Sequence, residues 1–182
     1  MEFEDSPDAP ESVGVVRNQY VKFIVHDEAR LAAVERVVSA FIQEARGTSR
    51  GTDEEWKSLF DEQSLQHFGW PTPEERKEWA ALWLGTHYSK RHLLPPTRWD
   101  FASFIDTVRT NEWDLLGVRR IDHSHAVIEF SSHAYPFGGT DCLVALAEAF
   151  GMQVIERDDG TGPRRYVTVT QYWKPHGGDP KS

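Results

Sequence analysis

Polar and apolar positions follow two different periods along the chain, and the changes between them divide it into elements. Residues 20–26 (YVKFIVH) combine β-branched and aromatic side chains in a short run, which predicts a strand. The following residues repeat apolar side chains every three to four positions, which predicts a long helix that Asp27 caps and Gly47 ends. Its apolar face comprises Leu31, Val34, Val38, Phe41 and Ala45.

Three shorter helices are predicted between residues 51 and 110. Thr52 and Thr72 are each followed three positions later by a glutamate, which is the capping-box pattern, and Pro73 suits the first helical position. Asp100 opens the third helix. The side chains expected to face the core are Trp56, Leu59, Phe60, Trp79, Leu82, Trp83, Phe101, Phe104, Ile105 and Val108.

The last third of the chain again predicts strands. Two hairpins and an intervening helix are expected at residues 115–122 with 126–132, at about 141–150, and at 152–157 with 164–173. The fold class is therefore α+β, in the order β-α, three helices, β-β-α-β-β. This order approximates a ferredoxin-like antiparallel sheet with helices packed on one face and a helical insertion at about 51–110.

Length and composition favour one globular domain. A chain of 182 residues, 39% hydrophobic and 12% aromatic, is long enough to bury its own core. The domain is expected over residues 18–174, between a disordered acidic arm at 1–17 and a flexible tail at 175–182.

The net charge of −9 is unevenly distributed. Residues 1–11 contain five acids and no base, which leaves 24 acids against 20 bases in the rest of the chain. Nucleic-acid binding requires a basic surface, so no nucleic-acid partner is expected. A basic protein partner would suit the charge, because complementary charges speed encounter.

Cysteine content and hydropathy bear on location. One cysteine excludes an internal disulfide and suits a reducing compartment. No apolar run approaches the ~20 residues that span a bilayer, and the acidic N-terminus is the reverse of a signal peptide. A cytoplasmic protein without membrane association is expected, and its oligomeric state is left open.

One candidate site is the segment HAYPFGGTDC, residues 133–142, where a strand turns into a helix. Gly138 and Gly139 allow a sharp turn, and Thr140 or Asp141 can cap the helix. Free N–H groups in a first turn attract anions, so Gly138, Gly139 and Thr140 are candidates for ligand or partner binding. The segment lacks the Lys-Ser/Thr of a phosphate-binding loop, and a simple strand-to-helix corner is favoured.

Cys142 is expected in the first turn of the same helix. That position can lower a thiol pKa, and His133 nearby would complete a nucleophile–base pair. Asp141 disfavours the thiolate, and a single cysteine is commonly buried. A packed thiol is therefore favoured, with catalysis by Cys142 and His133 as the alternative.

His123 and His125 form the remaining cluster, beside Asp122. Two histidines at this spacing on a continuous strand could share a metal, but a zinc site needs a third protein ligand that the sequence does not supply. An exposed polar turn is favoured, and no metal or other cofactor is expected.

Six of the seven tryptophans lie in or beside the helical insertion. Trp70 and Trp99 fall in loops, where aromatic side chains anchor partners or line ligand pockets. The basic stretch at residues 87–96 is interpreted as a helix C-terminus, where cations complement the dipole.

These observations lead to a hypothesis about function. The favoured function is a non-catalytic binding protein, an acidic regulator or inhibitor (immunity-type) of a more basic protein. The alternative is a small-ligand-binding protein or enzyme that uses Cys142 and His133.

Overall fold

The computed structural model of the protein describes residues 18–47, 51–94, 97–110, 113–132 and 140–167. The elements follow in the order β1 (Gln19–Ile24), α1 (Glu28–Arg46), α2 (Asp53–Lys57), α3 (Glu62–Leu65), α4 (Pro73–Gly85), the 3-10 helix η1 (Tyr88–Leu93), α5 (Phe101–Thr110), β2 (Trp113–Arg120), β3 (His125–Ser132), α6 (Asp141–Ala149), β4 (Gln153–Asp158) and β5 (Arg164–Arg165). The acidic segment expected at residues 1–17 and the tail expected at residues 175–182 lie outside the described residues. The α+β class is confirmed.

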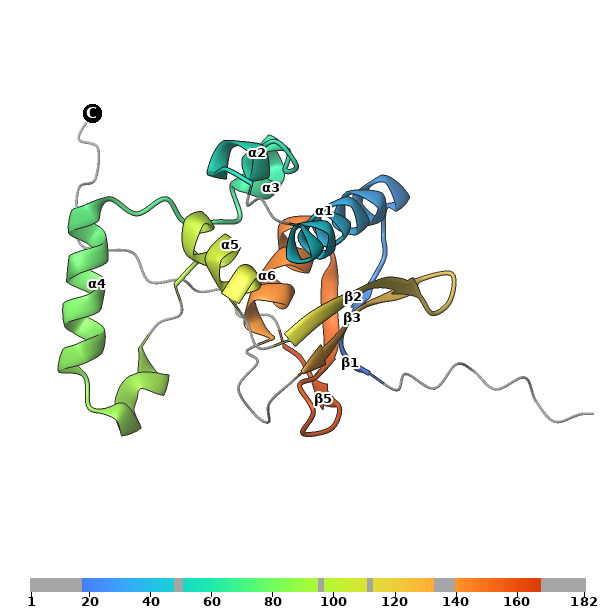
Figure 1. The fold of residues 1–182 in the computed structure, drawn as a ribbon. Coiled ribbons are helices and arrows are strands. Elements are labelled where there is room, and N and C mark those ends of the chain that lie inside the picture. The colour runs from blue at the N-terminus through green and yellow to red at the C-terminus, as the bar shows by residue number, and fades with distance from the viewer. Residues whose placement is uncertain (1–17, 48–50, 95–96, 111–112, 133–139, 168–182) are drawn as a thin grey trace, which may run out of the picture.

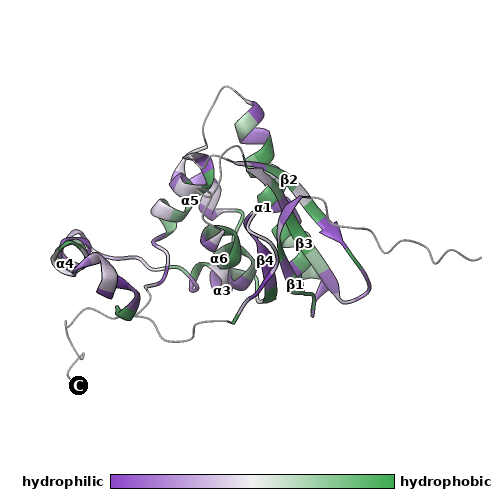
Figure 2. Ribbon diagram, turned by 90° about the horizontal axis from the view of Figure 1, so that it is seen from below, coloured by the Kyte–Doolittle hydropathy of each residue, from purple (hydrophilic) through white to green (hydrophobic). Residues whose placement is uncertain are grey.

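The five strands form one open antiparallel sheet in the order β2-β3-β1-β4-β5 (Figure 1). The central strand β1 pairs Val21 with Ile128 of β3 on one side and with Arg157 of β4 on the other. Helices α1, α5 and α6 lie on one side of this sheet (Figures 1 and 2). The expected antiparallel sheet with helices is therefore present.

Alternation along β1 directs its apolar side chains into the core. Val21, Phe23 and Val25 are buried, whereas Lys22 between them is partly exposed. Helix α1 buries four of the five positions that the sequence predicted, and only Ala45, in its last turn, is exposed. The 3.6-residue period therefore located the buried face of α1 because that helix packs along its length on the sheet and α5.

The helical insertion adds an aromatic cluster to the core. Phe60 of the α2–α3 connection lies 5.2 Å from Phe150, ring centroid to centroid, and 5.3 Å from Phe101 of α5. Phe68 packs edge-on against Phe60 at 5.7 Å and lies 4.8 Å from Phe104. These contacts attach the first and last parts of the insertion to the body of the protein.

Both predicted capping boxes are confirmed. Thr52 Oγ1 accepts from the Glu55 backbone N–H at 3.3 Å, and the Glu55 carboxylate accepts from the Thr52 N–H at 2.6 Å. Thr72 and Glu75 repeat the pair at 3.2 and 2.8 Å, with Pro73 as the first residue of α4. These caps satisfy N–H groups that a helix leaves unpaired at its start.

Two expectations about the elements need correction. The structure has short additional helices, α3 and η1, that sequence periodicity missed because four to six residues are too few to show a period. Of the strand expected at residues 164–173, the described part contains Arg164–Arg165 as β5, and residues 166 and 167 are not in a strand; residues 168–173 lie outside the described part. Within the described residues, no helix has the length and apolar composition to cross a membrane.

Candidate functional site

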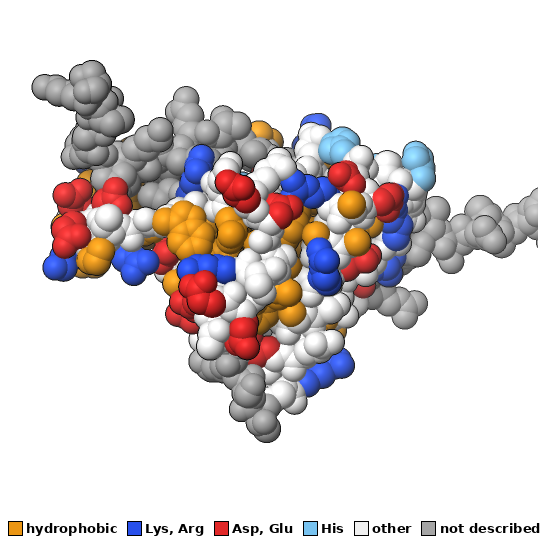
Figure 3. All heavy atoms as spheres, turned by 90° about the horizontal axis from the view of Figure 1, so that it is seen from above, with side chains coloured by type: hydrophobic (Ala, Val, Ile, Leu, Met, Phe, Trp, Pro, Cys, Tyr) orange, Lys and Arg blue, Asp and Glu red, His pale blue; other side chains and the backbone are white. Residues whose placement is uncertain are grey.

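A shallow hollow lies on the surface of the helical insertion. It has a volume of about 600 Å³ and opens widely to solvent. Its lining consists of Glu62, Leu65, Gln66, Phe68, Trp70 and Arg98, and we call it the Trp70 hollow. Figure 3 views the molecule from the side of α2 and α3 and shows apolar surface set between acidic and basic side chains.

Trp70 is held rigidly although it is 51% exposed. Its ring stacks on Phe101, with centroids 5.3 Å apart and planes inclined by 17°. Its indole N–H donates to the Leu65 carbonyl at 3.3 Å. The Lys57 ammonium lies 5.3 Å from the same ring centroid. A large aromatic side chain that is fixed in one place and half open to water can contact a partner at little entropic cost.

The segment that contains α2 and α3, next to the hollow, is rich in acids. Residues 53–65 contain five acids and one base, Lys57, which pairs with Glu54 at 2.7 Å. Asp61 caps α3, and the Ser64 backbone N–H, more than the nearby Arg30, lowers the pKa of its carboxyl. Glu62 remains on the rim of the hollow itself. The lining of the hollow therefore carries charge of both signs, with Glu62 and Arg98 in it and Lys57 over the Trp70 ring.

His67 adds a titratable group next to the hollow. Its Nε2 lies 4.0 Å from Glu148 Oε2, which is too far for a hydrogen bond. Burial lowers the pKa of His67, and the Arg98 guanidinium lowers it further. The imidazole is therefore neutral at physiological pH.

The two loop tryptophans are neighbours in the structure but differ in role. The Gly69 N–H donates to the Trp99 carbonyl at 2.7 Å, and the Phe101 N–H donates to the Gly69 carbonyl at 3.3 Å. The resulting bridge between Gly69 and Asp100 brings Trp70 and Trp99 together. The Trp99 side chain packs against the core and is not in the lining of the hollow, so of these two tryptophans only Trp70 presents its ring there.

Between Trp70 and Trp99, helices α4 and η1 project from the rest of the protein. We call this segment, residues 73–94, the arm. No residue of α4 is buried, so the expectation that Trp79, Leu82 and Trp83 face the core is wrong. The second half of α4 is apolar on every side. The helical spacing of Trp79, Leu82 and Trp83 therefore does not identify a packed face, and the prediction failed for this reason. Figures 1 and 2 both show α4 apart from the sheet and its covering helices.

The basic stretch after α4 acts in part as the sequence suggested. The Arg91 Nε–H donates to the carbonyls of Trp83 and Thr86 at 3.2 Å each, at the C-terminal end of α4. Its guanidinium also lies 4.8 Å from the Trp83 ring centroid. A cation at this end complements the helix dipole.

The start of α6 is occupied by protein groups. Thr140 is the N-cap and is buried, but its hydroxyl accepts from Arg157 at 3.1 Å instead of capping the helix. Arg157 also pairs with Asp141. Gly138, Gly139 and His133 lie outside the described residues, so the structure does not test their proposed roles.

Cys142 is completely buried in the hydrophobic core, next to Leu143 and Leu146 in α6. This placement agrees with a packed thiol. The alternative of catalysis by Cys142 with His133 stays a prediction.

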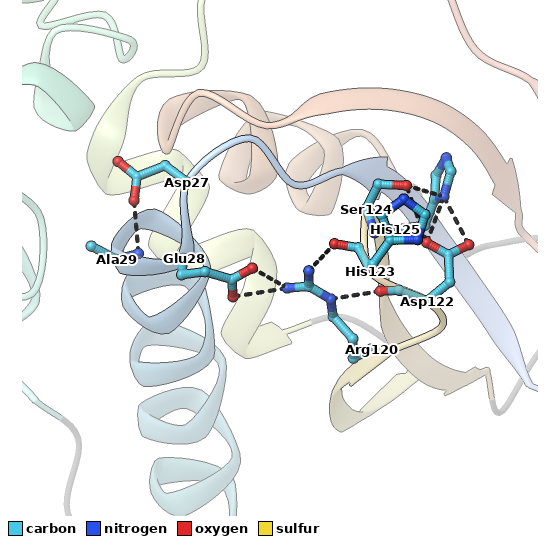
Figure 4. Close-up of polar contacts among 8 residues, drawn as sticks. All are labelled: Asp27, Glu28, Ala29, Arg120, Asp122, His123, Ser124 and His125. Carbon is cyan, nitrogen blue, oxygen red and sulfur yellow. Dashed lines mark hydrogen bonds and ion pairs between the residues drawn. The ribbon is translucent and has the colours of Figure 1, made fainter.

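The His123–His125 segment lies in a polar turn between β2 and β3, and Arg120 at the end of β2 connects this turn to Glu28 at the start of α1 (Figure 4). The Asp122 carboxylate accepts from the backbone N–H groups of Ser124 at 2.8 Å and His125 at 2.9 Å, and these bonds, with the His125 side chain, hold its pKa far below the usual range. Arg120 donates to the carbonyls of Asp122 and His123 and pairs with Glu28 at 2.8 Å.

This turn is not arranged as a catalytic triad. Ser124 Oγ and the Asp122 carboxylate both contact Nδ1 of His125, whereas proton relay requires the two partners on opposite ring nitrogens. Among the residues that the structure describes, no group of three or more His, Cys, Asp or Glu side chains is placed to hold a metal ion.

Comparisons with protein-family models, with curated proteins and with solved structures found no match to this chain.

Proposed function

We propose that this protein is a non-catalytic binding protein that docks a protein partner at the Trp70 hollow. The main support for this function is the half-exposed Trp70 ring, which stacks on Phe101 and donates a hydrogen bond to the Leu65 carbonyl. Interface energy concentrates on rigid aromatic anchors of this kind.

The charge of residues 53–65 and of the whole chain supports a partner that is more basic than this chain. The five acids of residues 53–65 outnumber the single base, and the whole chain carries a net charge of −9. Complementary charge at a rim accelerates encounter and selects against like-charged partners. An acidic protein that covers a basic surface in this way acts as a regulator or inhibitor, of the immunity type, in a reducing cytoplasm that suits its single cysteine.

We also infer a ferredoxin-like core. The support is the strand order β4-β1-β3-β2 within the sheet, with α1 after β1 and α6 after β3. In this arrangement the helices between α1 and β2 are an insertion that carries the hollow and the arm.

Affinity capture from native lysate with matched variants tests the proposed function. The control variant is Leu116→Ser, which changes an exposed apolar side chain on β2, a strand that does not line the hollow. Wild type and this control should capture the same protein. Trp70→Ala and Glu62→Lys should each lose it. Recovery of the same proteins by all four baits, or of none by wild type, overturns the proposal.

A further inference from the structure

His67 connects the Trp70 hollow to helix α6. Its two neighbours in the chain, Gln66 and Phe68, both line the hollow. The imidazole packs edge-on against the Phe68 ring, with centroids 5.9 Å apart. A displacement of the imidazole is therefore transmitted to the lining through the backbone of Gln66 and the ring of Phe68.

Charges of opposite sign face the imidazole from two parts of the fold. Arg98, in the segment before α5, also lines the hollow, and Glu148 belongs to α6. The Arg98 Nη1–H group donates to the Gln66 carbonyl at 2.9 Å, which fixes this cation to the lining. Glu148 Oε2 lies 4.0 Å from His67 Nε2. Within the described residues, these two are the charged groups placed against the imidazole.

This geometry belongs to the neutral imidazole. Burial and the Arg98 guanidinium lower the pKa of His67, and at 4.0 Å its Nε2 makes no hydrogen bond to Glu148. A proton changes the forces on the ring, because an imidazolium is attracted by Glu148 and repelled by Arg98. A charge-assisted hydrogen bond is about 2.8 Å long, so the ring must move by about 1 Å to form one.

We propose that His67 is a proton-operated switch for the Trp70 hollow, in which the imidazolium moves toward Glu148 and the lining at Gln66, Phe68 and Arg98 shifts with it. The neutral ring keeps the hollow in its present form, and the protonated ring produces a second form in acid. Packed side chains pass between discrete arrangements, so a small movement of one ring changes the shape of the surface beside it.

This inference rests on the proposed function, because it regulates docking at the same hollow. The acid form differs from the neutral form in shape and carries an additional positive charge near Arg98. Both differences reduce the affinity for a basic partner that fits the neutral form. The partner is therefore held at neutral pH and released as the pH falls through the pKa of His67.

NMR titration of the full chain tests the switch without a partner. The indole N–H of Trp70, which donates to the Leu65 carbonyl, reports on the hollow, and the ring protons of His67 report on its ionisation. Between about pH 7.5 and about pH 5 the Trp70 indole signal should shift with the midpoint of His67. The shift should be absent from His67→Gln. It should be retained in the control His92→Gln, which changes an exposed histidine of η1 that does not line the hollow.

The two facing charges give the titration a direction. Glu148→Gln should lower the midpoint of His67 and reduce the Trp70 shift, because the imidazolium loses the anion that attracts it. Arg98→Gln should raise the midpoint, because it removes the repelling cation. The switch is overturned by a Trp70 signal that does not titrate in wild type, that titrates equally in His67→Gln, or that is unchanged by Glu148→Gln.

A pH step after affinity capture separates this inference from the proposed function. The protein captured at neutral pH is washed at about pH 5.5, and the retained fraction is measured by mass spectrometry. Wild type should lose at least about threefold more of it than His67→Gln, which corresponds to a pKa difference of about half a unit between the free and bound forms.

Equal release from the two baits overturns regulation by His67 and leaves the proposed function standing. If wild type captures no protein at neutral pH, the proposed function fails and the regulation of docking fails with it. The NMR titration then still decides whether His67 operates the hollow.

Discussion

Phe68 and Trp70 occupy adjacent parts of the hollow but contribute differently to stability. Phe68 is almost completely buried and contacts three other phenylalanine rings, whereas Trp70 has one stacking partner and a half-exposed ring. Phe68→Ala should lower the free energy of unfolding by about 3–5 kcal/mol through the cavity it leaves. Trp70→Ala should lower it by only about 1 kcal/mol. Urea denaturation of both variants measures the difference, and equal losses would show that Trp70 is a core residue rather than an anchor for a partner.

The burial of Cys142 predicts its reactivity. A fully buried thiol should resist iodoacetamide at neutral pH and react only after denaturant unfolds the chain. Mass spectrometry of the alkylated protein measures the rate. Rapid labelling of the native protein with a midpoint below ~8.5, the value of a free thiol, would instead support the enzymatic alternative.

His67 predicts a pH dependence of stability. Since burial lowers its pKa in the folded state, the unfolded chain binds a proton more readily, and stability falls as pH drops below the ordinary imidazole value of ~6.5. Wild type should therefore lose more unfolding free energy than His67→Gln between about pH 7.5 and about pH 5.5. The exposed His92→Gln is the matched control and should behave as wild type. An identical pH dependence in His67→Gln would contradict the assignment.

At the scale of elements, α1 and α4 show when periodicity is informative. Both have apolar residues at helical spacing, but α1 lies on the sheet and α4 packs on no other element to a comparable extent. Apolar spacing shows which face of a helix is suited to packing. Whether that face is buried depends on the tertiary structure around it. The capping boxes were predictable because they depend only on residues three positions apart.

Hydrogen exchange can test the weak attachment of α4. A helix of thirteen residues without a packed face is marginally stable by itself. In the Leu84→Asp variant, α4 amides should exchange within about tenfold of the unstructured rate, far faster than those of α1 and α6. Protection of α4 equal to that of α1 in this variant would be at odds with a helix in which no residue is buried.

At the scale of the whole molecule, the sequence predicted the α+β class and the antiparallel sheet, because strand and helix signals in the first and last thirds are local and strong. It also singled out Trp70 as a loop aromatic. It could not predict the hollow, which depends on Phe101, Leu65 and Arg98 meeting across long separations in the chain. The arm was missed for a related reason, since only three-dimensional contacts separate a helix that is covered from one that is not.

The bridge between Gly69 and Asp100 has a consequence for how such a chain can change. It ties together the points where residues 70–99 depart and return, and neither α4 nor η1 between them has a buried residue, so insertions, deletions or replacements confined to residues 73–94 would leave strand pairing undisturbed. Replacing residues 73–94 with a different segment would therefore be a direct way to change the binding specificity of the protein.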